Sequence, residues 1–436
     1  MVFKKSKFLS YREKGLKLHL RVDPDGFGVL VINSNRVVYL NQTAAFYIEC
    51  MMRKLEEDDV YKLARRKFKN IDRDTVIKDY RDTIYKINSF ISGEYCPIHS
   101  LGFERREPFS SKLTAPLRVD IALTYECNNK CIHCYSSSPR KMNSLPTGKW
   151  VDVLRKLRDI GVPQVLFTGG EPTLFKDLPY LIRVTEDLGL VSGVVSNGRR
   201  FKDREYVEKL IKSGLDFVQI TLESHIREIH DRITRSPGSW DDTVNGVKNL
   251  VNENLYFTVN LTLSKWNYKD IGETIDFLHS LGVKRVSANK LIYSGFGAKV
   301  AEKFDLTPSE MRETLEEIID RTSEYNMDFI WYGVTRYCEL NPLELGLGIK
   351  SCTACYITMA IEPNGNVIPC QSYYKPIGNI LKDNWKKIWY HPLCIELRER
   401  RFMPQQCREC IFYNTCTGCP LEIPFKKYPE MALKEV

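Results

Sequence analysis

Three cysteines within residues 127–134 are the part of this sequence whose types and spacing most directly indicate chemistry. Cys127 and Cys131 are separated by three residues, and Cys131 and Cys134 by two. A structural zinc ion needs four ligands, so the three thiols would require a further ligand such as His133. Three thiolates can instead hold three irons of a [4Fe–4S] cluster and leave the fourth iron open. We favour the cluster and interpret His133 as a loop residue.

The neighbouring elements would place these thiols at one edge of a sheet. Residues 117–125 form an apolar run typical of a buried parallel strand, and the cysteines follow its carboxyl end. The next strand ends in Thr168, Gly169, Gly170 and Glu171. Two glycines let a backbone approach a ligand closely, and a carboxylate can bind an ammonium group. Loops at the carboxyl ends of parallel strands commonly carry active sites.

This combination resembles the cluster motif of the radical S-adenosylmethionine enzymes. In that family three spaced cysteines are followed by an aromatic residue, here Tyr135, and S-adenosylmethionine chelates the open iron. An electron from the cluster cleaves the sulfonium C–S bond and yields a 5′-deoxyadenosyl radical. The resemblance implies that Cys127, Cys131 and Cys134 are the catalytic cluster ligands. It also implies that Glu171 and its glycines bind the methionyl amino group.

Strands and helices alternate through residues 114–325, which predicts a parallel sheet with right-handed crossovers. The predicted strands are 117–125, 164–168, 191–196, 217–222, 256–263 and 286–291. The predicted helices are 147–160, 178–188, 205–213, 243–253 and 271–281. Six such units fit the partial (β/α)6 barrel of the family, which is open on one side for a large substrate.

Further residues at strand ends complete the expected cofactor site. Ser196 and Asn197 can hydrogen-bond ribose or carboxylate groups, and Glu223 follows the fourth strand. The position of a family arginine holds a threonine here, so we assign the carboxylate contact to the nearby Arg235. We expect the segment around Leu291 to line the binding site of the adenine. The predicted cofactor-binding set is Tyr135, Thr168, Gly169, Gly170, Glu171, Ser196, Asn197, Glu223, Arg235 and Leu291.

Residues 335–436 carry nine cysteines, and seven of them lie in a pattern of paired spacings that indicates metal ligation by either zinc or iron–sulfur clusters. The turn around Asn364 and Gly365 predicts a hairpin between them. The pattern resembles the auxiliary-cluster extension called SPASM. By position, the first auxiliary cluster would use Cys352, Cys355, Cys370 and Cys419, and the second would use Cys407, Cys410 and Cys416.

The eighth cysteine expected from the SPASM resemblance does not follow Cys419. Either the second cluster keeps an open or oxygen-ligated iron, with Glu422 or Glu430 as candidates, or only one auxiliary cluster forms. The remaining cysteines are interpreted as small buried apolar residues: Cys50, Cys96, Cys338 and Cys394.

Residues 1–95 predict a small winged-helix-like α+β domain. Two β-rich runs, 26–32 and 36–40, form a hairpin, and Asn41 or Thr43 is expected to cap the first of three helices. Residues 38–45 resemble the PqqD-like peptide chaperones of ribosomal-peptide modification. The resemblance implies that a leader peptide adds as a strand to the hairpin edge. The alternatives are a winged-helix domain with a purely structural role and one that binds nucleic acid. Residues 96–113 are predicted to be a linker.

The 436-residue chain is 43% hydrophobic and 27% charged, as in ordinary folded proteins of two or three domains. No apolar run is long enough for a membrane span and no signal-peptide core follows Met1, so we expect a cytoplasmic protein without a membrane partner. A reducing cytosol keeps thiols available as ligands. The net charge of +9 fits a solvated lysine-rich surface, or else a phosphate-rich or acidic partner.

The function expected from these resemblances is that of a radical S-adenosylmethionine maturase. It would abstract hydrogen from a peptide or protein and install a cross-link or an oxidation, with a ferredoxin- or flavodoxin-type donor supplying low-potential electrons. The first alternative is maturation of a metalloenzyme or its cofactor, of a tungsten-oxidoreductase or haem type. The second is a non-catalytic iron–sulfur or zinc regulator that binds nucleic acid.

Overall fold

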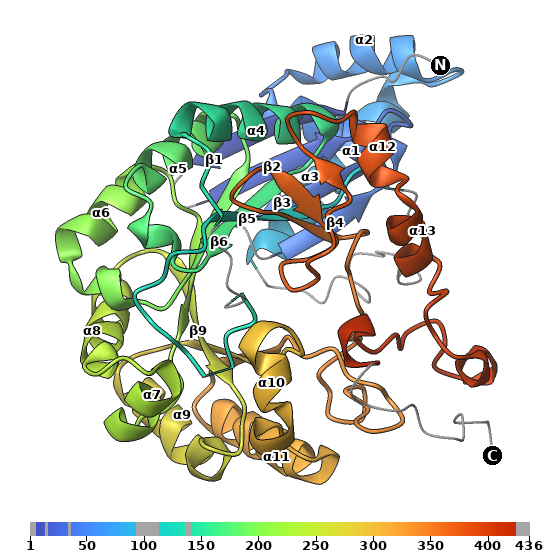
Figure 1. Cartoon of the computed structure of the whole chain (residues 1–436). Coiled ribbons are helices and arrows are strands. Elements are labelled where there is room, and N and C mark those ends of the chain that lie inside the picture. Colours follow the sequence, from blue (N-terminus) through green and yellow to red (C-terminus); the bar gives the residue numbers. More distant parts are fainter. Residues whose placement is uncertain (1–5, 14–15, 34–35, 93–112, 137–141, 424–436) are drawn as a thin grey trace. The chain divides into compact units, whose positions relative to one another are not determined.

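The computed structural model describes residues 6–13, 16–33, 36–92, 113–136 and 142–423 (Figure 1). These divide into two compact units. The first comprises residues 1–115 with 155–163 and 187–191, and the second comprises 116–154, 164–186 and 192–436, each apart from the undescribed stretches. Residues 93–112, which include Cys96 and most of the expected linker 96–113, lie outside the described residues. Within the described parts, no helix combines the length and low polarity needed to cross a bilayer.

The first unit contains a four-stranded antiparallel sheet with the strand order β1-β2-β3-β4. The expected hairpin is present as β3 (Gly28–Ile32) and β4 (Arg36–Leu40). Two further strands, β1 (Lys7–Glu13) and β2 (Leu16–Val22), were not predicted. Their signal lies in β2, where the alternate residues Leu18 and Leu20 are buried in the core.

Three helices follow this sheet, as predicted: α1 (Gln42–Met52), α2 (Glu57–Lys67) and α3 (Arg73–Ser92). Asn41 caps α1, because its Oδ1 accepts a hydrogen bond of 2.8 Å from the Ala44 amide. Buried residues of α1 and α3, among them Ile48 and Ile87, pack with the sheet in one apolar core.

The second unit is built on a ten-stranded sheet with the order β11-β10-β9-β8-β7-β6-β5-β12-β13-β14. The six predicted strands are present and adjacent in chain order: β5 (Arg118–Thr124), β6 (Gln164–Gly169), β7 (Val191–Ser196), β8 (Phe217–Thr221), β9 (Tyr256–Thr262) and β10 (Arg285–Asn289). Nearly all residues of β5 are buried, as expected of a parallel strand covered on both faces.

Helices connect these strands and cover the outer face of the sheet (Figure 1). The predicted helices are α4 (Thr147–Ile160), α5 (Leu178–Asp187), α6 (Arg204–Lys212), α8 (Ser239–Val251) and α9 (Ile271–Ser280). The structure adds α7 (Arg227–Thr234), α10 (Gly295–Phe304) and α11 (Pro308–Glu324).

The sheet continues beyond the six predicted strands on both sides. Strand β11 (Asp328–Trp331) pairs in parallel with β10. On the other side β12 (Thr358–Ile361) pairs in parallel with β5, with Ala360 opposite Asp120. The predicted hairpin is formed by β12 and β13 (Asn366–Ile368), and β14 (Gly378–Asn379) extends it. Two short helices follow, α12 (Trp385–Trp389) and α13 (Pro392–Arg398).

Candidate functional site

The loop that carries Cys127, Cys131 and Cys134 begins directly after β5 and is held by elements from distant parts of the barrel. The amides of Lys130 and Ile132 each donate a 2.9 Å hydrogen bond to carbonyls at the end of α7. The amide of Phe296, at the start of α10, donates to the Cys134 carbonyl at 3.0 Å. The loop therefore has a fixed backbone path.

The environment of the three thiols fits an iron–sulfur cluster. Burial raises the pKa of Cys127 to about 11 and raises the pKa of Cys131 well above its ordinary value. Such thiols ionise when a metal supplies positive charge. The Asn129 amide lies 3.4 Å from Cys127 Sγ, and the Ser136 hydroxyl lies 3.3 Å from Cys134 Sγ, so polar groups are ready to hydrogen-bond the sulfurs. Among the described residues, no three His, Cys, Asp or Glu side chains converge on the position of a single metal ion.

Gly169 and Gly170 pack against the segment that leads into the cysteine loop. The Gly170 amide donates to the Thr124 carbonyl and the Glu171 amide donates to the Glu126 carbonyl, both at 2.8 Å. A Cβ on Gly169 would lie 2.1 Å from Thr124 O, and one on Gly170 would lie 2.2 Å from Glu126 O. The sequence predicted that these glycines let the backbone approach a ligand closely. In the structure their lack of side chains also lets the backbone that leads into the cysteine loop pack directly against them.

The Glu171 carboxylate is buried and ties the ends of β6 and β7 together. Its Oε1 accepts hydrogen bonds from the Thr173 amide (3.1 Å), the Thr173 hydroxyl (2.7 Å) and the Ser196 hydroxyl (2.8 Å). Its Oε2 accepts one from the Asn197 amide (2.8 Å). Burial raises the pKa of Glu171, although these bonds oppose the shift. The Asn197 side chain in turn donates to Asn128 Oδ1 at 2.6 Å, within the cysteine loop.

A buried pair of side chains supports the loop from the opposite side. His133 Nε2 lies 3.2 Å from Glu223 Oε1, and the imidazole stacks on Phe304 with ring centroids 5.8 Å apart. Burial alone disfavours the imidazolium, but the charge and hydrogen bond of Glu223 outweigh it and raise the pKa of His133. His133 therefore positions the loop through Glu223, a role that its place between two cysteines did not reveal.

Two arginines lie near the cysteine loop or the helix that contacts it. Arg235 is exposed and ends α7 in a left-handed conformation with φ 50°. Arg199, which the sequence did not single out, donates to the Asn128 carbonyl at 2.8 Å and to Asn129 Oδ1 at 3.1 Å. It is oriented by Asp242, 2.9 Å from its Nη2. Leu291, expected beside the adenine, is buried in an apolar cluster.

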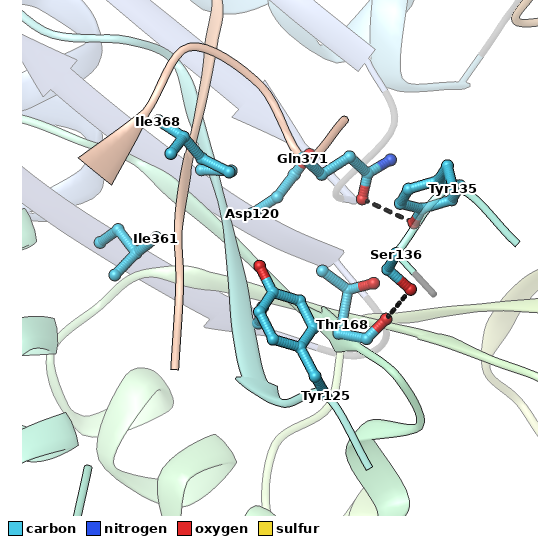
Figure 2. A pocket seen from close by; sticks show the side chains of 11 residues that line it. Asp120, Tyr125, Tyr135, Ser136, Thr168, Ile361, Ile368 and Gln371 are labelled. Atoms are coloured by element: carbon cyan, nitrogen blue, oxygen red, sulfur yellow. Dashed lines mark hydrogen bonds between the residues drawn. The ribbon is translucent and has the colours of Figure 1, made fainter. Parts of the chain in front are cut away.

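A pocket lies where β5 and β6 meet the C-terminal hairpin, and it is lined by three of the predicted cofactor-binding residues, Tyr135, Thr168 and Gly169 (Figure 2). Its cavity volume is about 10 Å³, which is room for about one water molecule. The Tyr135 hydroxyl donates to Gln371 Oε1 at 3.2 Å, so a residue after β13 completes its wall. Burial raises the pKa of the Asp120 carboxyl in this pocket, against the opposing effect of Arg118.

The C-terminal cysteines fall into two groups. The first group is Cys352, Cys355, Cys370 and Cys419. Burial raises the pKa of Cys419, and the charges of Cys352, Glu422 and Cys370 raise it further. Cys355 is buried and hydrogen-bonds to Cys394, while also interacting with Cys370.

The second group consists of Cys407, Cys410 and Cys416. Burial raises the pKa of Cys407, and the charges of Cys416 and Cys410 raise it further. Glu422, proposed as an oxygen ligand for this group, instead pairs with Lys290 at 2.5 Å. Glu430, the other candidate, lies outside the described residues.

Comparison with known protein families accounts for both sets of cysteines. Residues 121–278 match the radical SAM superfamily, and residues 352–411 match the SPASM iron–sulfur cluster-binding domain. The first match spans the cysteine loop, and the second contains most of the C-terminal cysteines. These matches decide between zinc and iron–sulfur ligation in favour of [4Fe–4S] clusters, auxiliary ones included.

Individual relatives cover different shares of the chain. Fe-coproporphyrin III synthase of Methanosarcina barkeri is 33% identical over 202 residues, which are 46% of this chain and 50% of that protein. Sporulation killing factor maturation protein SkfB of Bacillus subtilis is 25% identical over 321 residues, 73% of this chain and 74% of that protein. The crystal structure of Streptococcus suis SuiB bound to precursor peptide SuiA has a TM-score of 0.69 at 21% identity. It covers 97% of this chain and 98% of that one, so the two share a fold.

The cysteine loop, the glycine–glutamate turn that packs on it and the two family matches lead to one assignment. The chain belongs to the radical SAM superfamily and is a radical S-adenosylmethionine enzyme with a C-terminal SPASM domain for auxiliary iron–sulfur clusters.

Proposed function

We propose that this enzyme is a maturase that modifies a ribosomally made peptide, whose leader binds at the N-terminal sheet. The observation that carries the proposal is the edge strand β4. It ends the order of the four-stranded sheet, and its outward side chains Val37 and Tyr39 are 47% and 42% exposed. An extended peptide can add to such an edge through backbone hydrogen bonds, while exposed apolar side chains select among sequences. The likeness to SuiB, whose structure contains a precursor peptide, supports this.

Cys127, Cys131 and Cys134 would hold the cluster, which together with S-adenosylmethionine supplies a radical able to abstract hydrogen. The Asn129 amide and the Asn197 side chain, which lie 3.4 Å and 3.9 Å from Cys127 Sγ, would stabilise the thiolate by hydrogen bonding. The remaining residues of the loop are held in place by Arg199 and by the Glu223–His133 pair.

Glu171 and Asn197 would orient the methionyl end of S-adenosylmethionine beside the cluster. Among the described residues, Oε2 of Glu171 accepts a hydrogen bond from one group, the Asn197 amide, and a carboxylate oxygen can accept another from an ammonium group. Thr168 and Tyr135 line the neighbouring pocket, where they would contact the bound cofactor.

The test uses the full-length enzyme with its clusters, S-adenosylmethionine and a reductant, without oxygen. Synthetic peptides encoded by short reading frames beside the gene in the native host are the probes. We expect one peptide to bind, to change in mass and to stimulate 5′-deoxyadenosine release. If every such peptide leaves binding, mass and release unchanged, the peptide substrate is wrong.

A second candidate function rests on the relative with the higher identity. Fe-coproporphyrin III synthase is 33% identical over 46% of this chain, which supports maturation of a haem-type cofactor. Incubating the same enzyme with iron-tetrapyrrole precursors of Fe-coproporphyrin III separates the two proposals, because that compound is the product after which the relative is named. Formation of Fe-coproporphyrin III without any peptide would favour the second candidate.

A further inference from the structure

Cys338 belongs to the second group of C-terminal cysteines, although the sequence indicated an isolated apolar residue. Its side chain is exposed, in the segment that follows β11. The preceding residue, Tyr337, donates its backbone amide to Cys416 Sγ at 3.4 Å. Because consecutive Cα atoms are about 3.8 Å apart, Cys338 must lie beside the loop that carries Cys416.

Electrostatic interactions connect the four thiols through Cys416. Cys338 interacts with Cys416. Cys416 also interacts with Cys410, and Cys407 interacts with both. Cys338 therefore shares a neighbour with the other two cysteines of the group.

The segment around Cys338 is anchored to the cysteine loop, so this proximity is built into the fold. The Tyr337 ring packs on Phe412 with ring centroids 5.6 Å apart. The Lys350 amide donates to the Tyr337 hydroxyl at 2.9 Å. Arg336 is buried, pairs with Glu339 at 2.5 Å, and interacts electrostatically with the thiols of Cys338 and Cys407.

We propose that Cys338 is the fourth thiolate of the auxiliary cluster held by Cys407, Cys410 and Cys416. The inference rests on the SPASM assignment, not on the identity of the substrate. Each cysteine loses its proton on binding iron, and buried Arg336 offsets part of the added negative charge. A ligand that precedes the SPASM cysteines in the chain would be consistent with the lack of a cysteine in residues 420–436.

This ligation has a functional consequence. A cluster with four thiolates has no open iron, so this cluster would carry single electrons and would not bind a substrate thiol. The alternative ligand, Glu422, is less suited, because it pairs with Lys290 and interacts with Cys419 of the first group.

The first experiment maps thiol alkylation in the wild-type, full-length protein with and without its clusters, using iodoacetamide and peptide mass spectrometry. An exposed free thiol reacts in both states, whereas a ligated thiol reacts only after the iron is removed. We expect Cys338 to react at least about tenfold more slowly in the cluster-loaded protein, as Cys416 does. Equal rates for Cys338 in the two states would overturn the proposal.

The second experiment isolates the auxiliary clusters by replacing Cys127, Cys131 and Cys134 with alanine. Adding Cys338→Ala should remove about one iron per chain, because each thiolate of the cluster holds one iron. A [3Fe–4S] signal should then appear in the electron paramagnetic resonance spectrum. Cys416→Ala is the comparator, and Cys50→Ala, in the N-terminal core, is the matched control.

Iron content and spectra of Cys338→Ala equal to those of the Cys50→Ala control would contradict the proposal. These measurements need no substrate. If the peptide hypothesis is wrong, the iron and thiol measurements can still be interpreted. If Cys338 is not a ligand, the peptide hypothesis is unaffected.

Discussion

At the scale of single residues, the thiols, Glu171 and Glu223 were visible in the sequence, and the contacts that hold the cysteine loop were not. The spacing of Cys127, Cys131 and Cys134 needs no tertiary information, because all three lie in one loop. Arg199 and Glu223 reach this loop from other strands. Such contacts join residues 70 and 90 positions apart, and no local pattern encodes them.

Loss of one cluster thiol should abolish the reaction. Cys131→Ala leaves two of the three thiolates in the loop, so we expect no 5′-deoxyadenosine above background under reducing, oxygen-free conditions. Chromatography of the quenched mixture measures the product, with Cys50→Ala as the control. Release at the wild-type rate would refute the assignment of this loop.

Replacing the buried carboxylate should weaken cofactor binding. In Glu171→Gln, an amide that donates hydrogen bonds would face some of the four donors that the carboxylate now accepts from. Hydrogen bonds to a charged group contribute about 1.5–3 kcal/mol, so we expect about 10- to 100-fold weaker S-adenosylmethionine binding. Calorimetry with the cluster-loaded protein measures it. An unchanged Kd would show that Glu171 is only a structural link.

At the scale of elements, the local sequence pattern predicted whether a segment is a helix or a strand better than it predicted which strands pair with one another. The predicted bounds of α4 and β7 coincide with those observed, because apolar periodicity and a buried β-branched run are local signals. Strand β12 was predicted as half of a hairpin, but its pairing with β5 joins residues far apart in sequence. The short strand β11 carries too few residues for a period to show.

The packing of β6 on the cysteine loop can be tested by adding one methyl group. In Gly170→Ala the new Cβ would lie 2.2 Å from Glu126 O, so the loop must shift. We expect less iron bound at the Cys127 loop and slower 5′-deoxyadenosine release, measured by iron analysis and product assay. Gly148→Ala is the matched control, because its Cβ would meet nothing within 4 Å. Equal iron content in the two variants would contradict this account.

At the scale of the whole molecule, the proposed leader site and the cluster site belong to different compact units. If β4 recruits the substrate, Val37→Glu should weaken peptide binding about tenfold or more by placing a charge on an apolar contact. S-adenosylmethionine cleavage without peptide should remain unchanged. Fluorescence anisotropy of a labelled peptide measures binding, and Tyr85→Glu, at an exposed position of α3, is the control. Equal loss in both variants would point to a general effect of charge.

The pairing of β12 with β5 also bears on how the enzyme is made. Strand β5 carries the cysteine loop, yet one of its two neighbours is about 240 residues later in the chain. While the ribosome is still producing the intervening residues, that edge of β5 has no partner, and an unpaired buried strand invites association with other chains. If iron were inserted before residue 358 emerges from the ribosome, the cluster would form in a loop whose preceding strand, β5, still has an unpaired edge. Residues 358–361 must therefore be made before the sheet closes beside the strand that leads into the catalytic cluster loop.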